Sequence, residues 1–229
     1  MDPLRQRPLR QRIVLLGPPA SGKGTQADRL SSTFGIPHVS TGALLRAECA
    51  RGTLLGREAD AWTSKGLLVP DELAVRIVAA WMKENGPRFL FDGFPRTVTQ
   101  AEHLDKALGD LAAPLDLVIL LELSDEEIRR RILERLSCLA CGATFSASLH
   151  GHAAGDPCPR CGAALVRRND DTAEAIEERL RVYRESTLPV VGYYEKTAPS
   201  LFHRIDAGEG SDAIFAKLSE LVKDGKDEG

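Results

Sequence analysis

The sequence predicts an α/β fold, in which a five-stranded parallel sheet lies between two layers of helices and carries two insertions. Three observations lead to this prediction. Short apolar runs alternate with helical stretches along most of the chain. A glycine-rich loop joins the first apolar run to the first helical stretch. Finally, residues 40–69 and 134–171 interrupt the alternation, the first being helical throughout and the second rich in Gly, Ala, Cys and Pro.

The strands are predicted from apolar runs bounded by Gly or Pro, a pattern typical of strands buried on both faces. The first is Arg12–Leu16, and a short strand is expected to end at His38. The others are 88–92, 117–122 and 201–206. Helices are expected at 23–34, 72–84, 97–108, 125–136 and 173–185. Ser124 and Glu127 have the spacing of a capping box at the start of the fourth helix.

These elements divide the chain into a core and its additions. The core is expected to comprise residues 12–39, 70–133 and 172–222. The two insertions, 40–69 and 134–171, are expected to be mobile flaps mounted on this core. The charged ends, a basic segment 1–11 and residues 223–229, are expected to be disordered tails.

Composition narrows the class of protein. The 229 residues are 43% hydrophobic and 28% charged, with a formal net charge of −3. A nucleic-acid binder usually has a strong basic excess, which is absent here. No apolar run approaches the ~20 residues that span a bilayer. The basic N-terminus lacks the apolar stretch of a secretory signal. We therefore expect a cytoplasmic enzyme with no nucleic-acid or membrane partner.

The loop after the first strand, residues 17–25 (GPPASGKGT), predicts a phosphate-binding site. Glycines allow the backbone to fold around an anion so that successive N–H groups point at it. The start of the next helix adds its dipole, and Lys23 adds a mobile positive charge. Gly24 occupies the position where the general G-x-x-x-x-G-K-[ST] motif has Ser or Thr, and Thr25 follows one residue later.

Four of the five cysteines form two Cys-x-x-Cys pairs, each followed by Gly. Cys138 and Cys141 are separated from Cys158 and Cys161 by sixteen residues, 142–157. This spacing predicts a tetrahedral zinc site. Two disulfides are the competing interpretation, less common in a reducing compartment. Four thiolates complete the shell, so the zinc is expected to be structural. Zinc contributes about 10–16 kcal/mol of apparent folding free energy in zinc-finger peptides.

Five motifs in order resemble adenylate kinases, a family of nucleoside monophosphate kinases. They are GKGT at 22–25, STGALLR at 40–46, GLLVPD at 66–71, FDGFPR at 91–96 followed by Gln100, and RNDD at 168–171 followed by Arg179. The resemblance extends from Arg12 to about Leu221. It implies a Mg²⁺-dependent transfer of phosphate from ATP to AMP, giving two ADP. A zinc-containing second insertion resembles the long-lid members of the family.

The resemblance also implies roles for individual residues. The catalytic set it implies is Lys23, Arg96, Arg131, Arg135, Arg168 and Arg179. The implied ATP contacts are Gly17, Ala20, Ser21, Gly22, Lys23, Gly24, Thr25, Arg131, Arg135, Thr144, Phe145 and Glu209. The implied AMP contacts are Thr41, Arg46, Leu67, Val69, Gly93, Phe94, Arg96, Gln100, Arg168 and Arg179. Asp92 is expected to hold Mg²⁺ through water. Asp170 and Asp171 are expected to anchor arginines of the second insertion.

The sequence departs from the family pattern at three positions. Ala20 stands where many members have a third loop glycine, so the loop must accommodate a Cβ there. Leu136 follows Arg135 where a second Arg is common. Leu67 replaces a common Lys, at a contact expected through the backbone. None of these changes removes an arginine of the implied catalytic set.

Two alternatives remain at this stage. A kinase of the same fold with another base specificity, for UMP/CMP or for GTP and AMP, differs in contacts that the sequence does not resolve. A zinc-ribbon nucleic-acid module would require a basic surface and stacking aromatics around the cysteines, where only Phe145 is present.

A monomer is expected because both flaps must move freely.

Overall fold

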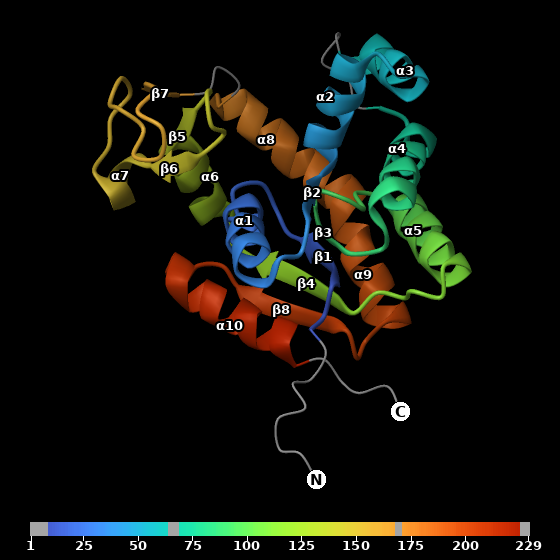
Figure 1. Ribbon diagram of the computed structural model, residues 1–229. Helices are drawn as coiled ribbons and strands as arrows, with labels where there is room; N and C mark the ends of the chain where they lie inside the picture. Colours follow the sequence, from blue (N-terminus) through green and yellow to red (C-terminus); the bar gives the residue numbers. More distant parts are fainter. Residues whose placement is uncertain (1–8, 64–68, 168–170, 225–229) are drawn as a thin grey trace.

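The computed structural model describes residues 9–63, 69–167 and 171–224 (Figure 1). Its central sheet has the order β2-β3-β1-β4-β8, and every neighbouring pair is parallel. The strands are β1 (Arg12–Leu16), β2 (His38–Ser40), β3 (Phe89–Asp92), β4 (Leu117–Glu122) and β8 (Phe202–Asp206). This confirms the predicted five-stranded parallel sheet.

Helices cover both faces of this sheet, as predicted. One layer contains α4 (Asp71–Asn85), α5 (Val98–Asp110) and α9 (Leu188–Thr197), and the other contains α1 (Lys23–Phe34) and α10 (Ser211–Lys223). Alternate residues of β1 pack against the two helical layers, because successive side chains of a strand point to opposite faces of the sheet. Val14 packs in the cluster with α4, α5 and α9, whereas Ile13 packs in the cluster with α1 and α10.

The two irregular segments lie beyond the sheet (Figure 1). The first contains α2 (Thr41–Arg51) and α3 (Leu54–Thr63). The second contains a separate antiparallel sheet of order β6-β5-β7 and the short α7 (Ala147–His150). Its strands are β5 (Arg135–Cys138), β6 (Thr144–Ser146) and β7 (Leu165–Val166), and it is flanked in sequence by α6 (Asp125–Leu133) and α8 (Ala173–Val182).

Several element bounds agree with the sequence prediction and a few do not. The bounds of β1, α1 and β4 are as predicted, and β3 and β8 begin one residue later. The helix predicted at 125–136 is wrong beyond Leu133. Arg135 and Leu136 instead begin β5, where they pair with Ser146 and Phe145. A pairing partner nine or more residues away leaves no local sign that would end the helix.

Two further bounds also differ from the prediction. His38 begins β2 rather than ending a strand. The helix predicted at 173–185 continues after Val182 as a π-helical segment, Tyr183–Thr187, and then as α9. Pro189, in the first turn of α9, has no N–H to donate four residues back, which favours a wider turn before it. One of the two hydrogen bonds of the predicted capping box at α6 is confirmed. Ser124 Oγ accepts from the Glu127 N–H at 3.3 Å.

The chain ends bear on the predicted tails. Residues 1–8 and 225–229 lie outside the described part of the chain. Arg10, within the segment predicted as a basic tail, is buried and donates its N–H to the Val222 carbonyl at 3.0 Å. Among the described residues, no helix is both long and apolar enough to cross a membrane.

Candidate functional site

The glycine-rich loop joins β1 to α1 at the carboxyl edge of the central sheet, where ligands bind in open α/β folds. Gly17 has φ +146°, and a Cβ there would lie 2.6 Å from the Leu121 carbonyl oxygen. Gly22 caps α1 with φ 89° and offers no side-chain cap. The first N–H groups of α1 therefore have no capping side chain and are suited to bind an anion.

Ala20 adopts φ 59°, a left-handed conformation that non-glycine residues rarely take. The loop thus accommodates a Cβ at this position, as the sequence requires. The Ala20 side chain packs against a cluster formed by Ile128 and Ile132 of α6 with Ile176 and Leu180 of α8. The phosphate loop is therefore in contact with both helices that flank the second insertion.

Lys23 places its ammonium inside the loop. Nζ donates to the carbonyl oxygens of Gly17 and Pro18, each at 2.8 Å, and to Ser21 Oγ at 3.4 Å. Burial lowers the pKa of Lys23 to about 8, with Arg96 acting in the same direction and Asp92 opposing it. A desolvated cation held by uncharged oxygen atoms is a strong attractor for phosphate.

Asp92 ends β3 beside this loop. Burial raises its pKa, but His38, Lys23 and Arg96 together outweigh burial and hold the pKa of Asp92 below its ordinary value. His38 Nδ1 lies 2.8 Å from Asp28 Oδ1, and His38 Nε2 lies 3.8 Å from Asp92 Oδ2. No motif in the sequence marks His38 as part of this site. Its position on a strand adjacent to β3 is the feature that brings it here.

Two of the residues assigned to AMP, Thr41 and Arg96, bond to the carbonyl of Gly93. Thr41 Oγ1 donates to the Gly93 carbonyl at 2.7 Å, and Arg96 Nε donates to the same oxygen at 2.8 Å. Gly93 has φ +76°, and a Cβ there would lie 3.1 Å from an Arg96 guanidinium nitrogen. Phe94 is buried against Phe91, with ring centroids 5.6 Å apart. One carbonyl thus fixes two of the side chains that the sequence assigns to AMP.

Gln100 is engaged on both sides of its amide. Its Oε1 accepts from the Arg96 N–H at 2.8 Å, and its Nε2 donates to Asp71 Oδ1 at 2.7 Å. Asp71 Oδ2 also accepts from Thr97 Oγ1 at 2.6 Å. Sequence reasoning did not find the role of Asp71, because its partners lie 26 and 29 residues away. The Gln100 amide therefore fixes the backbone that carries Arg96.

Arg135 of the second insertion and Arg179 of α8 share one carboxylate. Arg135 Nε donates to Asp171 Oδ2 at 2.9 Å and Nη2 donates to Oδ1, while Arg179 Nη1 donates to Oδ1 at 2.9 Å. The Asp171 side chain is only 5% exposed. This confirms the prediction that Asp171 anchors arginines. Arg168, Asp170 and Leu67 lie outside the described residues.

The remaining predicted contacts occupy separate places. Arg131 on α6 bonds to Glu127 and to the carbonyl of Ala207, in the turn that also contains Glu209. Thr144 and Phe145 lie on β6, paired with Ser137 and Leu136 of β5. Arg46 is exposed on α2, and Val69 packs between two apolar clusters. Of the predicted arginines within the described residues, Arg96 lies at Gly93, Arg135 and Arg179 at Asp171, and Arg131 at Ala207, while Arg46 lies apart on α2.

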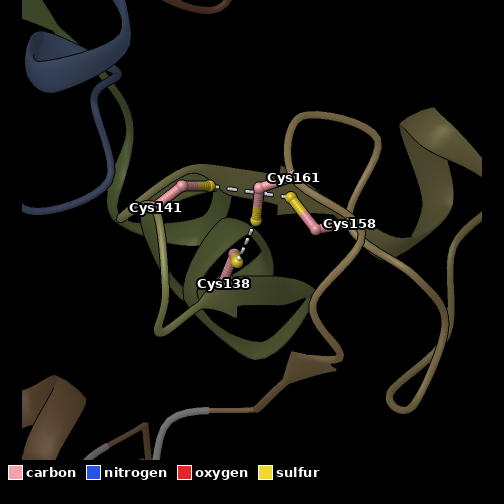
Figure 2. Close-up of side chains that lie close together, drawn as sticks. All are labelled: Cys138, Cys141, Cys158 and Cys161. Carbon is pink, nitrogen blue, oxygen red and sulfur yellow. Dashed lines mark hydrogen bonds between the residues drawn. The ribbon is translucent and has the colours of Figure 1, made fainter.

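Figure 2 shows the four cysteines of the second insertion with their sulfur atoms turned toward one another. The Sγ atoms of Cys138 and Cys161 are 3.4 Å apart, those of Cys141 and Cys158 are 3.7 Å apart, and all four lie within 4.8 Å of each other. A disulfide needs about 2.05 Å. Sulfurs about 2.3 Å from one zinc ion would be about 3.8 Å apart in a tetrahedron. The cluster fits a metal ion and not two disulfides, which corrects the competing interpretation.

The two Cys-x-x-Cys turns have matching backbone hydrogen bonds. Gly142 donates its N–H to the Cys138 carbonyl at 2.9 Å, and Gly162 donates to the Cys158 carbonyl at 2.8 Å. Both glycines have positive φ, 72° and 78°. N–H groups of residues 140 and 141 point at the Cys138 sulfur and lower the pKa of that thiol to about 6. The first turn thus stabilises the thiolate form of Cys138, the form that binds metal. In the second turn the Ala163 N–H acts in the same direction on Cys161, but the neighbouring sulfurs outweigh it and raise the pKa of that thiol to about 12.

Comparisons with known proteins agree with this geometry. The sequence model of the adenylate kinase family matches residues 15–199. An adenylate kinase of Alkaliphilus oremlandii is 43% identical over 211 residues, covering 90% of this chain and 96% of that protein. One of Thermodesulfovibrio yellowstonii is 43% identical over 215 residues, covering 93% and 99%. One of Archaeoglobus fulgidus is 38% identical over 215 residues, covering 92% and 97%.

Proposed function

Since this chain belongs to the adenylate kinase family, we propose that it transfers the terminal phosphoryl group of ATP to AMP, reversibly, giving two ADP. The observation that carries this proposal is the glycine-rich loop with Lys23 at its centre. It lies at the carboxyl edge of the sheet, with Asp92 and Arg96 close enough to affect the pKa of Lys23. Cationic and backbone N–H groups that converge in this way suit a polyphosphate.

Phosphoryl transfer asks the protein mainly to position two nucleotides in line and to neutralise charge. On the donor side, Lys23 would exchange its bonds to the Gly17 and Pro18 carbonyls for phosphate oxygens of ATP. Loop residues 17, 20–22, 24 and 25 would surround the same phosphates with backbone N–H groups. This exchange is favourable because a desolvated ammonium gains more from an anion than from neutral carbonyl groups.

On the acceptor side, Arg46 and Arg96 would hold the AMP phosphate, and the groups around Gly93 would hold its base. Thr41, Val69, Phe94 and Gln100 belong to this side, together with Leu67 beyond the described residues. The Gln100 amide already bonds Asp71 and the Arg96 N–H. We therefore propose that Gln100 acts on AMP chiefly by fixing the loop that carries Arg96.

The second insertion and the two helices that flank it, α6 and α8, would supply charge to the transferring group. Arg135 and Arg179, held together by Asp171, present two guanidinium groups on one buried carboxylate. Arg131 would contact ATP from α6, and Arg168 is assigned to the phosphates near the transfer point. Thr144, Phe145 and Glu209 would border the adenine. Movement of both insertions toward the sheet would complete the site and exclude water.

Two metal ions belong to the proposal. Asp92 fits the outer shell of Mg²⁺, because its carboxylate lies beside the phosphate loop with a lowered pKa and is therefore ionised. Bound to ATP, Mg²⁺ would neutralise phosphate charge. The four cysteines fit a structural Zn²⁺, which would cross-link the two turns. Thiolate sites accept several metals, and we propose zinc from the four-sulfur donor set.

The test is ADP formation measured with AMP, UMP, CMP and GMP offered separately as acceptors, and with ATP and GTP as donors. We expect rapid turnover only with AMP and a preference for ATP. A pyrimidine acceptor would retain the fold but refute the assignment of the AMP base site. No transfer to any acceptor by folded, metal-containing protein would refute the enzyme assignment. We further propose a cytoplasmic monomer, which size-exclusion chromatography with light scattering tests for oligomeric state.

A further inference from the structure

Arg131 is fixed at two edges of its guanidinium. Nε donates to Glu127 Oε1 at 2.7 Å, and Nη2 donates to the Ala207 carbonyl at 2.7 Å. The two side chains are 20% and 24% exposed, so the pair is mostly shielded from solvent. Bonds at two different edges restrict the guanidinium to one plane. Arg131 is therefore oriented in the protein without a nucleotide.

The carboxylate of Glu127 is not used to cap its own helix. In a capping box the Glu side chain returns to the N–H of the capping residue, here Ser124. Both Glu127 oxygens instead accept from arginines: Oε1 from Arg131 and Arg130, and Oε2 from Arg130. Within the described part of the chain, no hydrogen bond joins Glu127 to the Ser124 N–H. This carboxylate therefore accepts hydrogen bonds from two arginines of α6.

The turn that receives Arg131 is itself anchored to the core. Ala207 donates its N–H to the Glu122 carbonyl at 2.8 Å, at the end of β4. Four residues later, the Ser211 carbonyl accepts from Gln26 Nε2 at 2.9 Å. Gln26 is buried on α1, the helix that begins at the phosphate loop. The plane of Arg131 is thus fixed relative to the same helix that carries the phosphate site.

We propose that Glu127 is a positioning residue for the donor nucleotide, holding the Arg131 guanidinium against the Ala207 carbonyl before ATP binds. The proposal rests on the proposed function, which assigns Arg131 to ATP. Ordering a long side chain during binding costs affinity, and an arginine already held in place avoids much of that cost. Loss of the Glu127 carboxylate should therefore weaken ATP binding and leave AMP binding unchanged.

A purely structural role for Glu127 predicts a different result. The pair Glu127–Arg131 has i,i+4 spacing, and such pairs also stabilise a helix. If that were its only role, removing Glu127 would lower the thermal midpoint and affect the two nucleotides alike. Arg130 provides the matched control, because it bonds the same carboxylate but is exposed and forms its other ion pair with Glu134.

The experiment measures Kd for ATP and for AMP separately, together with both KM values, in E127A, E127Q, R130A, R131A and the double variant E127A/R131A. We expect E127A to raise Kd and KM for ATP about fivefold, from the ordering cost of one long side chain. The Kd for AMP should not change in E127A. The thermal midpoint should not change in R130A. E127Q, which keeps an oxygen acceptor for Arg131, should recover most of the ATP affinity. The double variant should bind ATP no more weakly than R131A, because the two residues act as one unit.

The outcomes separate this proposal from the function on which it rests. If R131A weakens ATP binding but E127A does not, Glu127 has no positioning role. If E127A weakens ATP and AMP binding equally, its role is structural and the proposal is refuted. If R131A leaves ATP binding unchanged, the assignment of Arg131 to ATP fails and the positioning role fails with it.

Discussion

The first insertion, α2 and α3, and the second, the sheet of β5, β6 and β7, are held to the core by different means. The first shares an apolar cluster with α4, in which Ala59 of α3 packs with Leu73 and Ile77 of α4. Leu44 and Val69 extend this cluster to the main core under the sheet. The first insertion is therefore a continuation of the hydrophobic core.

The second insertion has a small cluster of its own. Its buried members are Leu136, Cys138, Cys158 and Leu165, and two of these four belong to the four-cysteine cluster. The residues packed around them are mostly Ala and Cys. Burial of so few apolar side chains contributes little free energy against the entropy of ordering the segment. The comparison indicates that four clustered cysteines in the second insertion take the place of the apolar residues that stabilise the first.

Removing the metal should produce the largest difference between the two insertions. Chelation, or Cys158→Ser, should unfold residues 135–167, since metal binding supplies their folding free energy. Hydrogen exchange should show loss of amide protection in β5 and β7, with β1, β4 and α2 still protected. ATP turnover should fall because Arg135 begins β5.

The control for metal removal is Cys49→Ser in the first insertion. Cys49 Sγ donates to the Gly56 carbonyl at 3.3 Å and lies apart from the four-cysteine cluster. This variant should retain one zinc per chain and full protection of β5. If the second insertion keeps its amide protection after chelation, the comparison is contradicted. The apolar cluster of that insertion would then be enough to keep it folded.

Gly56→Ala should break the first insertion and spare the second. A Cβ at Gly56 would lie 2.0 Å from the Glu48 carbonyl oxygen, so α2 and α3 would have to separate. Overpacking of this kind costs about 1–3 kcal/mol. We expect KM for AMP to rise with KM for ATP unchanged. Gly109→Ala, on α5 with open space around it, is the matched control and should stabilise the fold slightly.

The pH dependence of Lys23 should be independent of both insertions. Its pKa is lowered to about 8 in the free protein, so its positive charge is lost as pH rises through 8. kcat/KM for ATP should therefore decline above pH 8, approaching tenfold per pH unit. kcat at saturating ATP should decline only at higher pH, because bound phosphates favour the charged amine.

The same decline in kcat/KM should persist in the Gly56→Ala and metal-free proteins, although their absolute rates differ. A profile that stays flat to pH 9.5 in the parent protein would show that Lys23 remains charged in the free loop. A decline that disappears when the metal is removed would show that the second insertion, and not burial within the loop, sets this pKa.

Features of this fold that depend on local sequence were predictable. Apolar runs bounded by Gly or Pro predicted the strands of the core, and the spacing of the two Cys-x-x-Cys pairs predicted the four-cysteine cluster. Each apolar run, and each Cys-x-x-Cys pair taken by itself, is contained within a few residues. The same holds for the phosphate loop, whose sequence lies between a strand and a helix as the motif requires.

Features that depend on distant partners were not predictable. The helix expected to reach residue 136 ends at Leu133, because Leu136 pairs with Phe145 in the small sheet. The role of Asp71 depends on Gln100 and Thr97. The anchor for Arg131 is a backbone carbonyl, that of Ala207, which any residue type provides. A backbone acceptor leaves no mark in the sequence, so such contacts emerge only from the structure.

The smallest expected effect concerns an ion pair between the first insertion and the core. Arg76 on α4 donates from Nη1 to Glu58 Oε2 of α3 at 2.7 Å and from Nη2 to Oε1 at 3.2 Å. Both side chains are exposed, at 52% and 39%, where water and salt screen such pairs. If apolar packing holds α3 to the core, Arg76→Ala should lower the thermal midpoint by less than about 2 °C.

The same variant should leave KM for AMP within about twofold of the parent value, since most exposed pairs contribute little. Repeating both measurements in about 1 M salt, where the Debye length is about 3 Å, should remove any remaining difference. A larger, salt-sensitive rise in KM for AMP would show that this ion pair, rather than the cluster of Ala59, Leu73 and Ile77, sets the position of α3. Both insertions would then be held by polar interactions, the second by a bound metal and the first by a salt bridge.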